Sequence, residues 1–375
     1  MKPRAYDVAI IGAGIVGAAC AEACASEGLR VGIVEADIIG GGATAAGMGH
    51  LVVMDDSEAQ FSLTRYSQVL WQRLAAELPS DAEYESCGTI WVAADAGEMD
   101  AVRKKREFFQ ARGVPVGVLD AKSLREAEPN LREGLAGGLL VPGDAVIYAP
   151  CAARFLIKRA QSHGAQVHLP CVVTEITADG LRLNDGSLIA ARWIVNAAGT
   201  WSPELTPGIE VKKRKGHLVI TDRYPGFVKH QLVELGYLKS AHSMTAESVA
   251  FNVQPRRTGQ LLIGSSRQFE VGSKEIDANI MSRMLVRAEE FLPGMRKLST
   301  IRSWTGFRAA TPDKLPLIGP LPARENLLLA TGHEGLGITT SLATARLVAD
   351  QLLQRASEIP AEPYLPARIP ERVHV

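Results

Sequence analysis

The sequence predicts an α/β protein that folds as one large or two medium domains, and three observations support this prediction. The chain has 375 residues, of which 46% are hydrophobic, so it can bury a full core. Residues 7–37 show strand, turn, helix and strand patterns in the order of a βαβ unit. Residues 164–203 show short alternating strands followed by an apolar strand at 193–196.

The βαβ unit contains a nucleotide-binding motif, "DVAIIGAGIVGAACAEACASEGLRVGIVEAD". Gly12, Gly14 and Gly17 have the GxGxxG spacing, which allows a tight turn, a close approach of a pyrophosphate and close packing of helix on strand. The phosphates would face the positive N-terminal end of the helix. Glu35 ends the second strand, where a carboxylate accepts hydrogen bonds from an adenosine ribose. The motif predicts a Rossmann-type dinucleotide site but does not decide between NAD and FAD.

Two further segments place small residues where a ligand could lie against the backbone. The loop "IIGGGATAAGMGHLVVMDD" at 38–56 has no bulky side chain from residue 40 to residue 47. Thr44 in this loop can bond a phosphate oxygen, although a flexible loop is the plain alternative. The strand at 193–196 ends in Ala197, Ala198 and Gly199, and the carboxyl ends of strands are where an open α/β sheet receives its ligand.

A third glycine-rich segment, "TGHEGLGITT" at 331–340, follows the apolar strand "NLLLATG" and leads into a helix. Its glycines leave backbone N–H groups at the helix N-terminus, where a negatively charged group can bind. A metal site is not expected, because His333 and Glu334 are adjacent and no other ligand stands at a matching spacing. A plain helix cap is the structural alternative.

The composition excludes other classes of function. Lysine plus arginine and aspartate plus glutamate number 41 each, so no net charge steers the chain to nucleic acid or to an anionic membrane. The five cysteines lack zinc or iron–sulfur spacing, and we expect reduced thiols in a cytoplasmic protein. Residues 1–26 could pass as a signal peptide, but cleavage there would destroy the nucleotide motif, so no targeting segment is inferred.

The order of these motifs resembles the family of FAD-dependent D-amino-acid oxidases and dehydrogenases, which includes glycine oxidase and sarcosine oxidase. The resemblance is carried by the GxGxxG with Glu35, "GGATAAGMGH", "NAAGTWS", "GFRAATPDKLPLIGP" and "GHEGLGITT", and it is weak from about residue 80 to 140. The stretches "GMGHLVVMDDSEAQFSLTRYS", "NVQPRRTGQLLIGSSRQ" and "GHEGLGITTSLATARLVAD" are most similar to catalytic subunits of D-hydroxyproline dehydrogenase, hydrogen cyanide synthase, opine dehydrogenase and dye-linked proline dehydrogenase.

The resemblance implies a Rossmann-type FAD-binding domain and a second, mainly antiparallel α+β substrate domain. The first would comprise residues 1–80, 141–210 and 301–375, and the second residues 81–140 and 211–300. The implied cofactor is non-covalent FAD, and some relatives also hold FMN at a subunit interface. The residues expected to contact FAD are Gly12, Gly14, Ile15, Val16, Gly17, Glu35, Ala36, Ala43, Thr44, Gly47, Met48, Val173, Ala197, Ala198, Gly199, Trp201, Gly332, His333, Gly335, Leu336, Gly337, Ile338 and Thr339.

On the substrate side, the resemblance points to Arg308 in "IRSWTGFRAATPDKLPLIG". A planar guanidinium binds a carboxylate through two parallel hydrogen bonds, and relatives hold an amino-acid carboxylate at the matching position. Arg302 is the nearby structural competitor. His50 is a second catalytic candidate that could equally be a solvated or core histidine. Tyr237 and His242 could shape the pocket from the second domain.

The implied reaction is oxidation of the carbon–nitrogen bond of a D-amino or imino acid by hydride transfer to flavin N5. The leading substrate is cis-4-hydroxy-D-proline, which would give a pyrroline carboxylate. Electrons would pass to different subunits that carry a flavin or an iron–sulfur relay, and the enzyme would be cytoplasmic or membrane-associated through these partners. The alternatives are a stand-alone glycine or D-amino-acid oxidase that produces hydrogen peroxide, an opine dehydrogenase subunit, and a non-catalytic flavin-binding assembly subunit.

The basic run in "VKKRKGHLVITD" at 211–222 also has two interpretations. It fits a solvated face of a strand, or a site for an anionic partner or phosphate group such as that of FMN.

Overall fold

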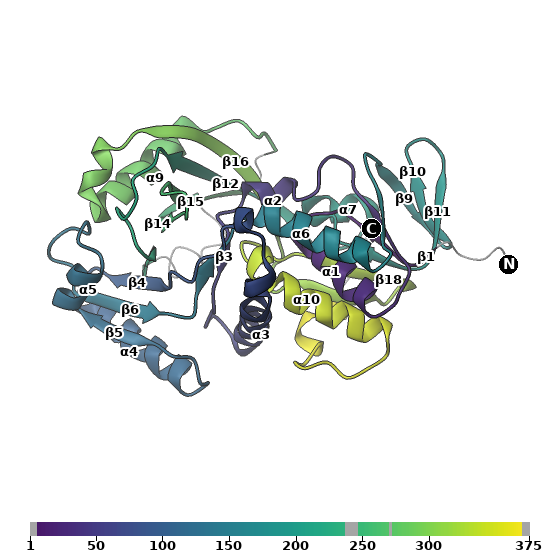
Figure 1. Cartoon of the computed structure of the whole chain (residues 1–375), viewed down its shortest axis with the longest axis horizontal. Helices are drawn as coiled ribbons and strands as arrows, with labels where there is room; N and C mark the ends of the chain where they lie inside the picture. The colour runs from purple at the N-terminus through teal and green to yellow at the C-terminus, as the bar shows by residue number, and fades with distance from the viewer. Residues whose placement is uncertain (1–5, 237–246, 270–271, 370–375) are drawn as a thin grey trace.

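The computed structural model describes residues 6–236, 247–269 and 272–369, which form two large β-sheets with helices packed around them. The two sheets occupy opposite halves of the molecule along its longest axis (Figure 1). Near the middle lie α3 (Glu58–Leu74) and a small ribbon of β3 (His50–Leu51) and β7 (Ala145–Val146). The α/β fold class predicted from the sequence is confirmed.

The first sheet has the parallel core expected of a dinucleotide-binding domain. Its order is β17-β18-β11-β1-β2-β8, in which β1 pairs in parallel with β2 and β11. Val8 and Ile10 of β1 pack toward the helices, whereas Ala9 and Ile11 pack on the other face against the antiparallel ribbon β9–β10. Its strands are β1 (Tyr6–Ile11), β2 (Val31–Val34), β8 (Gln166–His168), β9 (Val173–Thr177), β10 (Gly180–Leu183), β11 (Leu188–Asn196), β17 (Leu317–Leu321) and β18 (Arg324–Thr331).

Helix α1 is central to the helical layer on this sheet. Alanine, glycine and cysteine make up most of its residues, and they are buried around most of its circumference, so neighbouring helices approach closely on two sides. Helix α3 begins after the cap Ser57, whose hydroxyl accepts a hydrogen bond from Gln60 N. The helices of this half are α1 (Ile15–Ser26), α2 (Gly42–Ala46), α3, α6 (Ala149–Ser162), α7 (Ser202–Leu205) and α10 (Gly337–Leu352).

The second sheet is antiparallel except where β13 pairs in parallel with β4. Its order is β16-β12-β15-β14-β13-β4-β6-β5, and α9 packs on β14 and β15 through a stacked Phe251–Phe291 pair with ring centroids 4.4 Å apart. The elements are β4 (Thr89–Ala93), α4 (Ala96–Gln110), β5 (Gly117–Asp120), α5 (Ala121–Ala127), β6 (Gly137–Val141), β12 (Lys212–Thr221), β13 (Gln231–Glu234), β14 (Ser248–Pro255), β15 (Leu261–Phe269), α9 (Ala278–Phe291) and β16 (Thr300–Ala310).

The strand pairing bears on the predicted domain boundaries. Strand β16, which begins at residue 300, pairs along its length with β12 of the second sheet. The division at 301 therefore separates a strand from the sheet to which it belongs, and the pairing favours a boundary near residue 311. The division into two domains remains a prediction.

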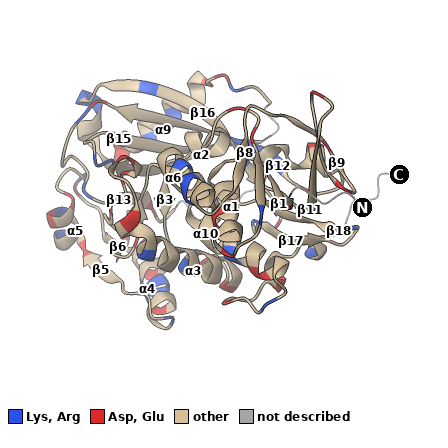
Figure 2. Cartoon of the chain, turned by 45° about the vertical axis from the view of Figure 1, so that its right-hand side comes forward, with Lys and Arg blue, Asp and Glu red and all other residues tan. Residues whose placement is uncertain are grey.

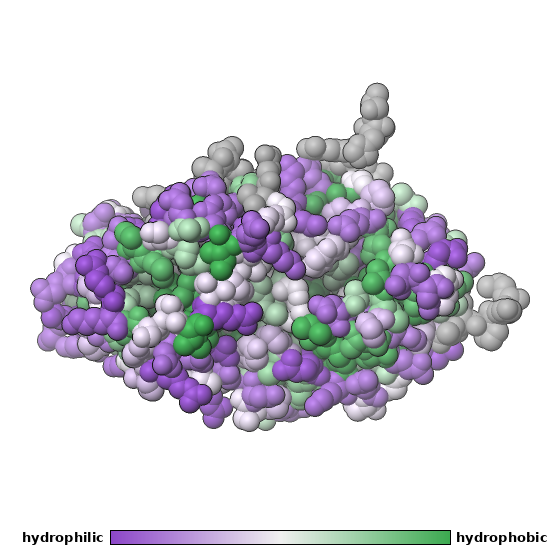
Figure 3. All heavy atoms as spheres, turned by 90° about the horizontal axis from the view of Figure 1, so that it is seen from above, coloured by the Kyte–Doolittle hydropathy of each residue, from purple (hydrophilic) through white to green (hydrophobic). Residues whose placement is uncertain are grey.

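The structure also bears on what the sequence predicted about the cysteines, the surface charge and a membrane span. All five cysteines are free thiols, and burial raises the pKa of Cys24 to about 12. Basic and acidic residues are interspersed along the chain (Figure 2), and hydrophilic and hydrophobic residues alternate over the face seen in Figure 3. Within the described ranges, none of the helices combines the length and the apolar character needed to span a membrane. Tyr237 and His242 lie outside the described residues.

Candidate active site

The turn from β1 to α1 has the geometry of a nucleotide-binding turn. Gly12 has φ +95°, and a Cβ atom there would lie 2.9 Å from Ala197 O, so only glycine fits. Gly17 faces Gly12 O across the start of the helix. Gly14 precedes α1, and Ile15 and Val16 form its first turn. The sequence pattern thus produces the close packing of helix on strand that the motif requires.

Two polar side chains flank this turn. Glu35 Oε2 accepts a hydrogen bond from Ala13 N at 2.7 Å, and Oε1 accepts one from Asp37 N at 2.9 Å. Thr44 in α2 is buried, and its hydroxyl oxygen accepts from Ile15 N at 2.9 Å. The Thr44 hydroxyl keeps its own hydrogen to donate, and a carboxylate can accept further bonds. Both side chains therefore flank the turn with free hydrogen-bonding capacity, and their contacts with a phosphate and a ribose remain a prediction.

The end of β11 meets this turn from the neighbouring strand. Ala197 N donates to Ile11 O at 3.1 Å, Ala198 N donates to Asn196 Oδ1, and Gly199 has φ +57°. Trp201 is 43% exposed. Ala36 and Val173 are the candidates on the adenosine side. Ala36 follows Glu35 directly, and Val173 lies two residues after Cys171. A hydrogen bond from Cys171 N to Glu35 O joins these two segments.

The glycine-rich turn before α10 closes the site from the C-terminal half. Gly332 has φ +79°, and His333 is buried with its Nε2 3.0 Å from Thr344 Oγ1. Burial lowers the pKa of His333 to about 3, so its ring is neutral. Leu336 precedes α10, and Gly337 lies against His333 and Val16 of α1.

The start of α10 also contacts the small-residue loop. Thr339 Oγ1 donates to His50 O at 2.8 Å, and a Cβ atom on Gly47 would lie 2.8 Å from Ile338 Cδ1. Ala43 lies in α2, and Met48 packs in a small core with Leu218, Ile220 and Leu262 of the second sheet. The loop therefore lies between α10 and the second sheet.

Neither of the helices at these turns is capped by a side chain. Among the helices of the described ranges, the N-cap residues of α1, α2, α6, α7 and α10 provide no side-chain hydrogen bond, whereas α3, α4, α5 and α9 begin after a capping serine or aspartate. Uncapped N–H groups and the positive end of a helix dipole favour negatively charged ligand groups. The residues present thus fit FAD: the start of α1 could hold its pyrophosphate, and the start of α10 could face the electron-rich end of its ring, which remains a prediction.

Arg308 extends from β16 toward this glycine-rich turn. Its Nη1 donates to Ser266 O at 3.0 Å, and a Cβ atom on Gly216 would lie only 2.6 Å from that nitrogen. The side chain reaches Gly335, whose Cβ position would be 3.8 Å from Arg308 Cδ. By contrast, Arg302 on the same strand is exposed and lies over the Trp304 ring. The geometry therefore favours Arg308 over Arg302 as the substrate clamp, which remains a prediction.

His50 lies within a cluster of polar side chains. Its Nδ1 is hydrogen-bonded to Gln231 Oε1, and Asn252 Nδ2 lies 3.4 Å from its Nε2. Burial, and secondarily the charge of Arg308, lowers the pKa of His50 to about 4. His50 is therefore neutral at physiological pH and can accept or donate a hydrogen bond.

Sequence reasoning missed several residues of this cluster. Gln231, Asn252, Gln254 and Ser265 are all buried, and Gln254 Nε2 donates to Met48 O at 2.5 Å. Asn252 and Gln254 occupy alternate positions in "NVQ" of β14. This alternation of polar residues is visible in the sequence, but it also occurs on solvated strand faces, so it does not predict burial.

The basic run at 211–222 was interpreted as a solvated strand face or an anion site. In the structure the run is partly buried, so it is not a fully solvated face. Lys212 and Lys213 are exposed, whereas Arg214 and Lys215 are buried. Arg214 Nη1 forms an ion pair with Glu334 Oε1 at 2.7 Å, and Lys215 donates to Glu275 O. The run thus ties the second sheet to the turn before α10.

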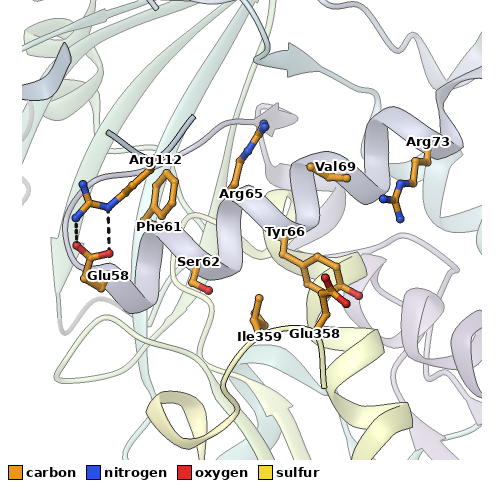
Figure 4. Close-up of a pocket in the computed structure, with 10 residues that line it drawn as sticks. All are labelled: Glu58, Phe61, Ser62, Arg65, Tyr66, Val69, Arg73, Arg112, Glu358 and Ile359. Atoms are coloured by element: carbon orange, nitrogen blue, oxygen red, sulfur yellow. Dashed lines mark hydrogen bonds and ion pairs between the residues drawn. The ribbon is translucent and has the colours of Figure 1, made fainter. Parts of the chain in front are cut away.

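A separate surface pocket of about 550 Å³ lies along α3 (Figure 4). Its lining includes Phe61, Tyr66 and an ion pair between Arg112 and Glu58. None of the predicted site residues lines this pocket, so it is distinct from the candidate active site.

Comparison with known proteins gives a consistent result. The family model described as FAD dependent oxidoreductase matches residues 7–351. Glycine oxidase of Geobacillus kaustophilus is 30% identical over 96% of both chains, and its crystal structure superposes with a TM-score of 0.87 over 97% of this chain and 99% of that one. The hydrogen cyanide synthase subunit HcnC of Pseudomonas aeruginosa is 27% identical over 97% of this chain and 96% of its own. The fold is also that of L-proline dehydrogenase from P. horikoshii, with a TM-score of 0.87, 21% identity and 98% of each chain covered. The chain therefore belongs to the DAO family of FAD-dependent oxidoreductases.

Proposed function

We propose that this chain is the FAD-binding catalytic subunit of a dehydrogenase that oxidises the carbon–nitrogen bond of a D-amino or imino acid. The leading substrate is cis-4-hydroxy-D-proline, and the product would be a pyrroline carboxylate. The observation that carries the proposal is the position of Arg308, which lies beside Gly335 of the turn before α10 and close enough to His50 to lower its pKa.

Arg308 can hold a substrate carboxylate. A guanidinium has five N–H donors, and the bond to Ser266 O uses one of them. Two parallel bonds to a carboxylate would fix the orientation of the substrate as well as neutralise its charge. Glu334 forms its direct ion pair with Arg214, while Arg308 acts on it through charge and keeps N–H donors for a substrate.

His50 can orient the amine of the same substrate. Its low pKa makes it a weak base, so we assign it the role of a hydrogen-bond acceptor for an amine N–H. FAD, when bound, supplies the hydride acceptor for the substrate Cα–H. The protein residues then have to hold the Cα–H in position and exclude water, and they need not remove a proton from carbon.

Two oxygen atoms in the polar cluster support a hydroxylated substrate. Asn252 Oδ1 and Gln254 Oε1 are buried, and neither has a hydrogen-bond partner among the residues that the structure describes. An unpaired buried acceptor costs about 1–3 kcal/mol, which a donor on the substrate would recover. A ring hydroxyl is such a donor, and this favours hydroxyproline over proline.

A stand-alone glycine or D-amino-acid oxidase is the second candidate, and the 30% identity to glycine oxidase over 96% of both chains favours it. The similarity to HcnC, named as a subunit, favours a multi-subunit enzyme. The cytoplasmic location and the FMN site at a subunit interface are part of the proposal and rest on the resemblance alone.

A substrate panel tests the proposal. Purified FAD-loaded protein would be mixed anaerobically with D-hydroxyproline, D-proline, glycine, sarcosine and opines, and bleaching of the flavin band would be followed, with an artificial dye as acceptor for turnover. We expect hydroxyproline to give the highest kcat/KM. Faster reduction by glycine or by an opine would contradict the substrate assignment, and no bleaching by any compound would favour the non-catalytic alternative.

A further inference from the structure

The guanidinium of Arg308 rests on residues of two other strands in its sheet. Its Nη1 donates to Ser266 O of β15 at 3.0 Å. A Cβ atom on Gly216 of β12 would lie 2.6 Å from Nη1 and 2.7 Å from Nη2, so the guanidinium lies directly over this glycine. Arg308 is half-buried, whereas Ser266 is completely buried. The position of the Ser266 carbonyl therefore bears directly on where the guanidinium points.

Ser266 lies where the pairing of β12 with β15 is irregular. The register shifts here, so residues 216–218 of β12 lie opposite 264–267 of β15, which contributes one residue more. Such a bulge interrupts the regular backbone ladder. His217 N, which would donate to a backbone carbonyl of β15 in a regular ladder, donates instead to Ser266 Oγ at 2.9 Å. The side chain of Ser266 thus replaces a ladder bond at the bulge.

The ring of His217 bonds the same hydroxyl group. Gly216 lies under the Arg308 guanidinium, so the next side chain, that of His217, projects from the opposite face of the sheet. There Nε2 accepts a hydrogen bond from Asp277 N at 3.0 Å, and Nδ1 lies 2.9 Å from Ser266 Oγ. Asp277 is the N-cap of α9, so the ring is held between that helix and the bulge.

The donor at Nε2 fixes the tautomer of His217. A backbone N–H can only donate, so Nε2 carries the lone pair and the hydrogen of the neutral ring is on Nδ1. Nδ1–H then donates to Ser266 Oγ, whose second lone pair accepts from His217 N. Both residues are completely buried, so water does not compete for these bonds. Two hydrogen bonds from one residue therefore hold the Ser266 side chain in a single orientation.

We infer that His217 is a positioning residue, which holds Ser266 through these two bonds and so fixes the carbonyl that orients Arg308 toward a substrate carboxylate. The inference rests on the proposed function for the role of Arg308, although the hydrogen bonds themselves do not. His217 acts from the face of the sheet opposite to the guanidinium, so it acts through Ser266. Loss of its ring bond would let Ser266 turn and the guanidinium shift, and a misplacement of about 1 Å costs roughly 100-fold in rate.

Two substitutions of His217 separate its two ring bonds. Asparagine places an N–H near the position of Nδ1 and no atom near Nε2, so His217→Asn keeps the bond to Ser266 Oγ and loses the bond from Asp277 N. Glutamine reaches the position of Nε2, so His217→Gln keeps the bond from Asp277 N and loses the bond to Ser266 Oγ. Each variant loses one buried hydrogen bond, so a merely structural role predicts similar effects of the two.

The test is the binding of acetate, a carboxylate without an amine, to the FAD-loaded enzyme, followed by flavin absorbance and calorimetry. We expect the Kd for acetate to rise roughly 10- to 100-fold in His217→Gln and in Arg308→Ala, and to stay near wild type in the conservative variant His217→Asn. Ser266→Ala should act like His217→Gln, and combining the two should add little because they break the same bond. With the substrate that the panel identifies, KM should rise in His217→Gln far more than kcat changes.

Equal losses in His217→Asn and His217→Gln, or acetate binding of wild-type strength in a folded, FAD-loaded His217→Gln, would overturn the inference. Weaker binding in Arg308→Ala but not in His217→Gln would overturn the inference alone and leave the proposed clamp intact. Unchanged binding in Arg308→Ala would overturn the clamp and the inference with it. In the wild type, the ¹⁵N spectrum should show the Nδ1–H tautomer of His217, and an Nε2–H tautomer would overturn the inference even if every variant failed to fold.

Discussion

Arg308 and His50 come from opposite ends of the chain, yet the charge of Arg308 adds to burial in lowering the pKa of His50 to about 4. The strand that carries Arg308 reaches His50 because Gly306 of β16 packs on Ala46, just before the loop that ends at His50. The charge of a cation thus acts on a neutral imidazole, and such a pair would suit a substrate with a carboxylate and an amine on one carbon.

The first prediction is that Arg308→Ala loses substrate binding while it keeps FAD. Arg308 is half-buried, and a bound substrate would desolvate it, so removing this charged anchor should cost about 2–5 kcal/mol, or roughly 30- to several-thousand-fold in kcat/KM. Arg302→Ala is the matched control, because Arg302 lies on the same strand but is exposed. Steady-state kinetics and the flavin absorbance per protein check both. Full activity of Arg308→Ala, or selective loss in Arg302→Ala, would show that the clamp is misassigned.

The second prediction concerns the ion pair between Arg214 and Glu334. Glu334→Gln leaves the buried Arg214 without its carboxylate partner and should lower the free energy of unfolding by about 3 kcal/mol. Although burial alone would raise the pKa of Glu334, the charges of Arg214, Arg308 and Arg267 lower it below its ordinary value of 4.5. The stabilisation is therefore fully present above pH 4.5 and is lost as the pH falls through the lowered folded-state pKa.

Urea unfolding of wild type and Glu334→Gln, both saturated with FAD, would measure this difference at several pH values. Glu175→Gln serves as a control, because the Arg182–Glu175 pair is exposed and should contribute little. Equal stability of the wild type and Glu334→Gln at pH 7 would contradict the prediction, as would a difference that grows on acidification.

Local sequence signals predicted the parts of the site that depend on backbone conformation. The spacing of Gly12, Gly14 and Gly17 requires a particular turn, and the same turn is found between β1 and α1. Residues 197–199 were predicted at the carboxyl end of a strand, and the turn before α10 was predicted to follow an apolar strand. The structure brings both to the turn after β1 because β1, β11 and β18 are neighbours in one parallel sheet.

The residues that sequence reasoning missed are defined by long-range packing. Gln231 and Gln254 come from two different strands, β13 and β14, and nothing local distinguishes a buried glutamine from a solvated one. The basic run that contains Arg214 fitted either a solvated face or an anion site, and in the structure Arg214 is buried beside Glu334 of the distant C-terminal turn, which balances its charge. Such pairings become visible only when both strands are in place.

The third prediction tests the close packing of β16 on the loop before His50. A Cβ atom on Gly306 would lie 2.3 Å from Ala46 Cβ, so Gly306→Ala should separate the strand from α2 and cost about 1–3 kcal/mol. Gly117→Ala is the control, because Gly117 is also a strand residue and a Cβ atom there meets no described atom within 4 Å. The melting temperature and the affinity for FAD would be measured for both variants. An equal effect of Gly306→Ala and Gly117→Ala would refute the packing argument.

The fourth prediction is a pH dependence that arises from Asp144. Burial raises its pKa from 3.8 to about 7, against the lowering effects of Thr89, Val53 N, Lys105 and Gln68. Between these two values the folded protein retains a proton that the unfolded chain has lost, so the stability contributed by this group falls as the pH rises. Asp144→Asn lacks this titration, and its stability relative to wild type should rise by roughly 2–4 kcal/mol from pH 4 to pH 7. Urea unfolding across this range measures the difference, and a pH-independent difference would count against the raised pKa.

The fifth prediction is that electrons leave the reduced enzyme through another protein and not mainly through oxygen. The five cysteines are free thiols; Cys20 and Cys24 share α1 and the other three lie in separate segments, without iron–sulfur spacing, so we expect an iron–sulfur relay on a different subunit. Each turnover leaves two electrons on the cofactor, and the next turnover requires their removal. We therefore expect the isolated chain, once reduced anaerobically by substrate, to reoxidise slowly when mixed with oxygen and rapidly when mixed with a dye acceptor. Fast reoxidation with one hydrogen peroxide per reduced flavin, in a preparation containing this chain alone, would instead establish the oxidase, and the similarity to glycine oxidase would then extend from the fold to the choice of electron acceptor.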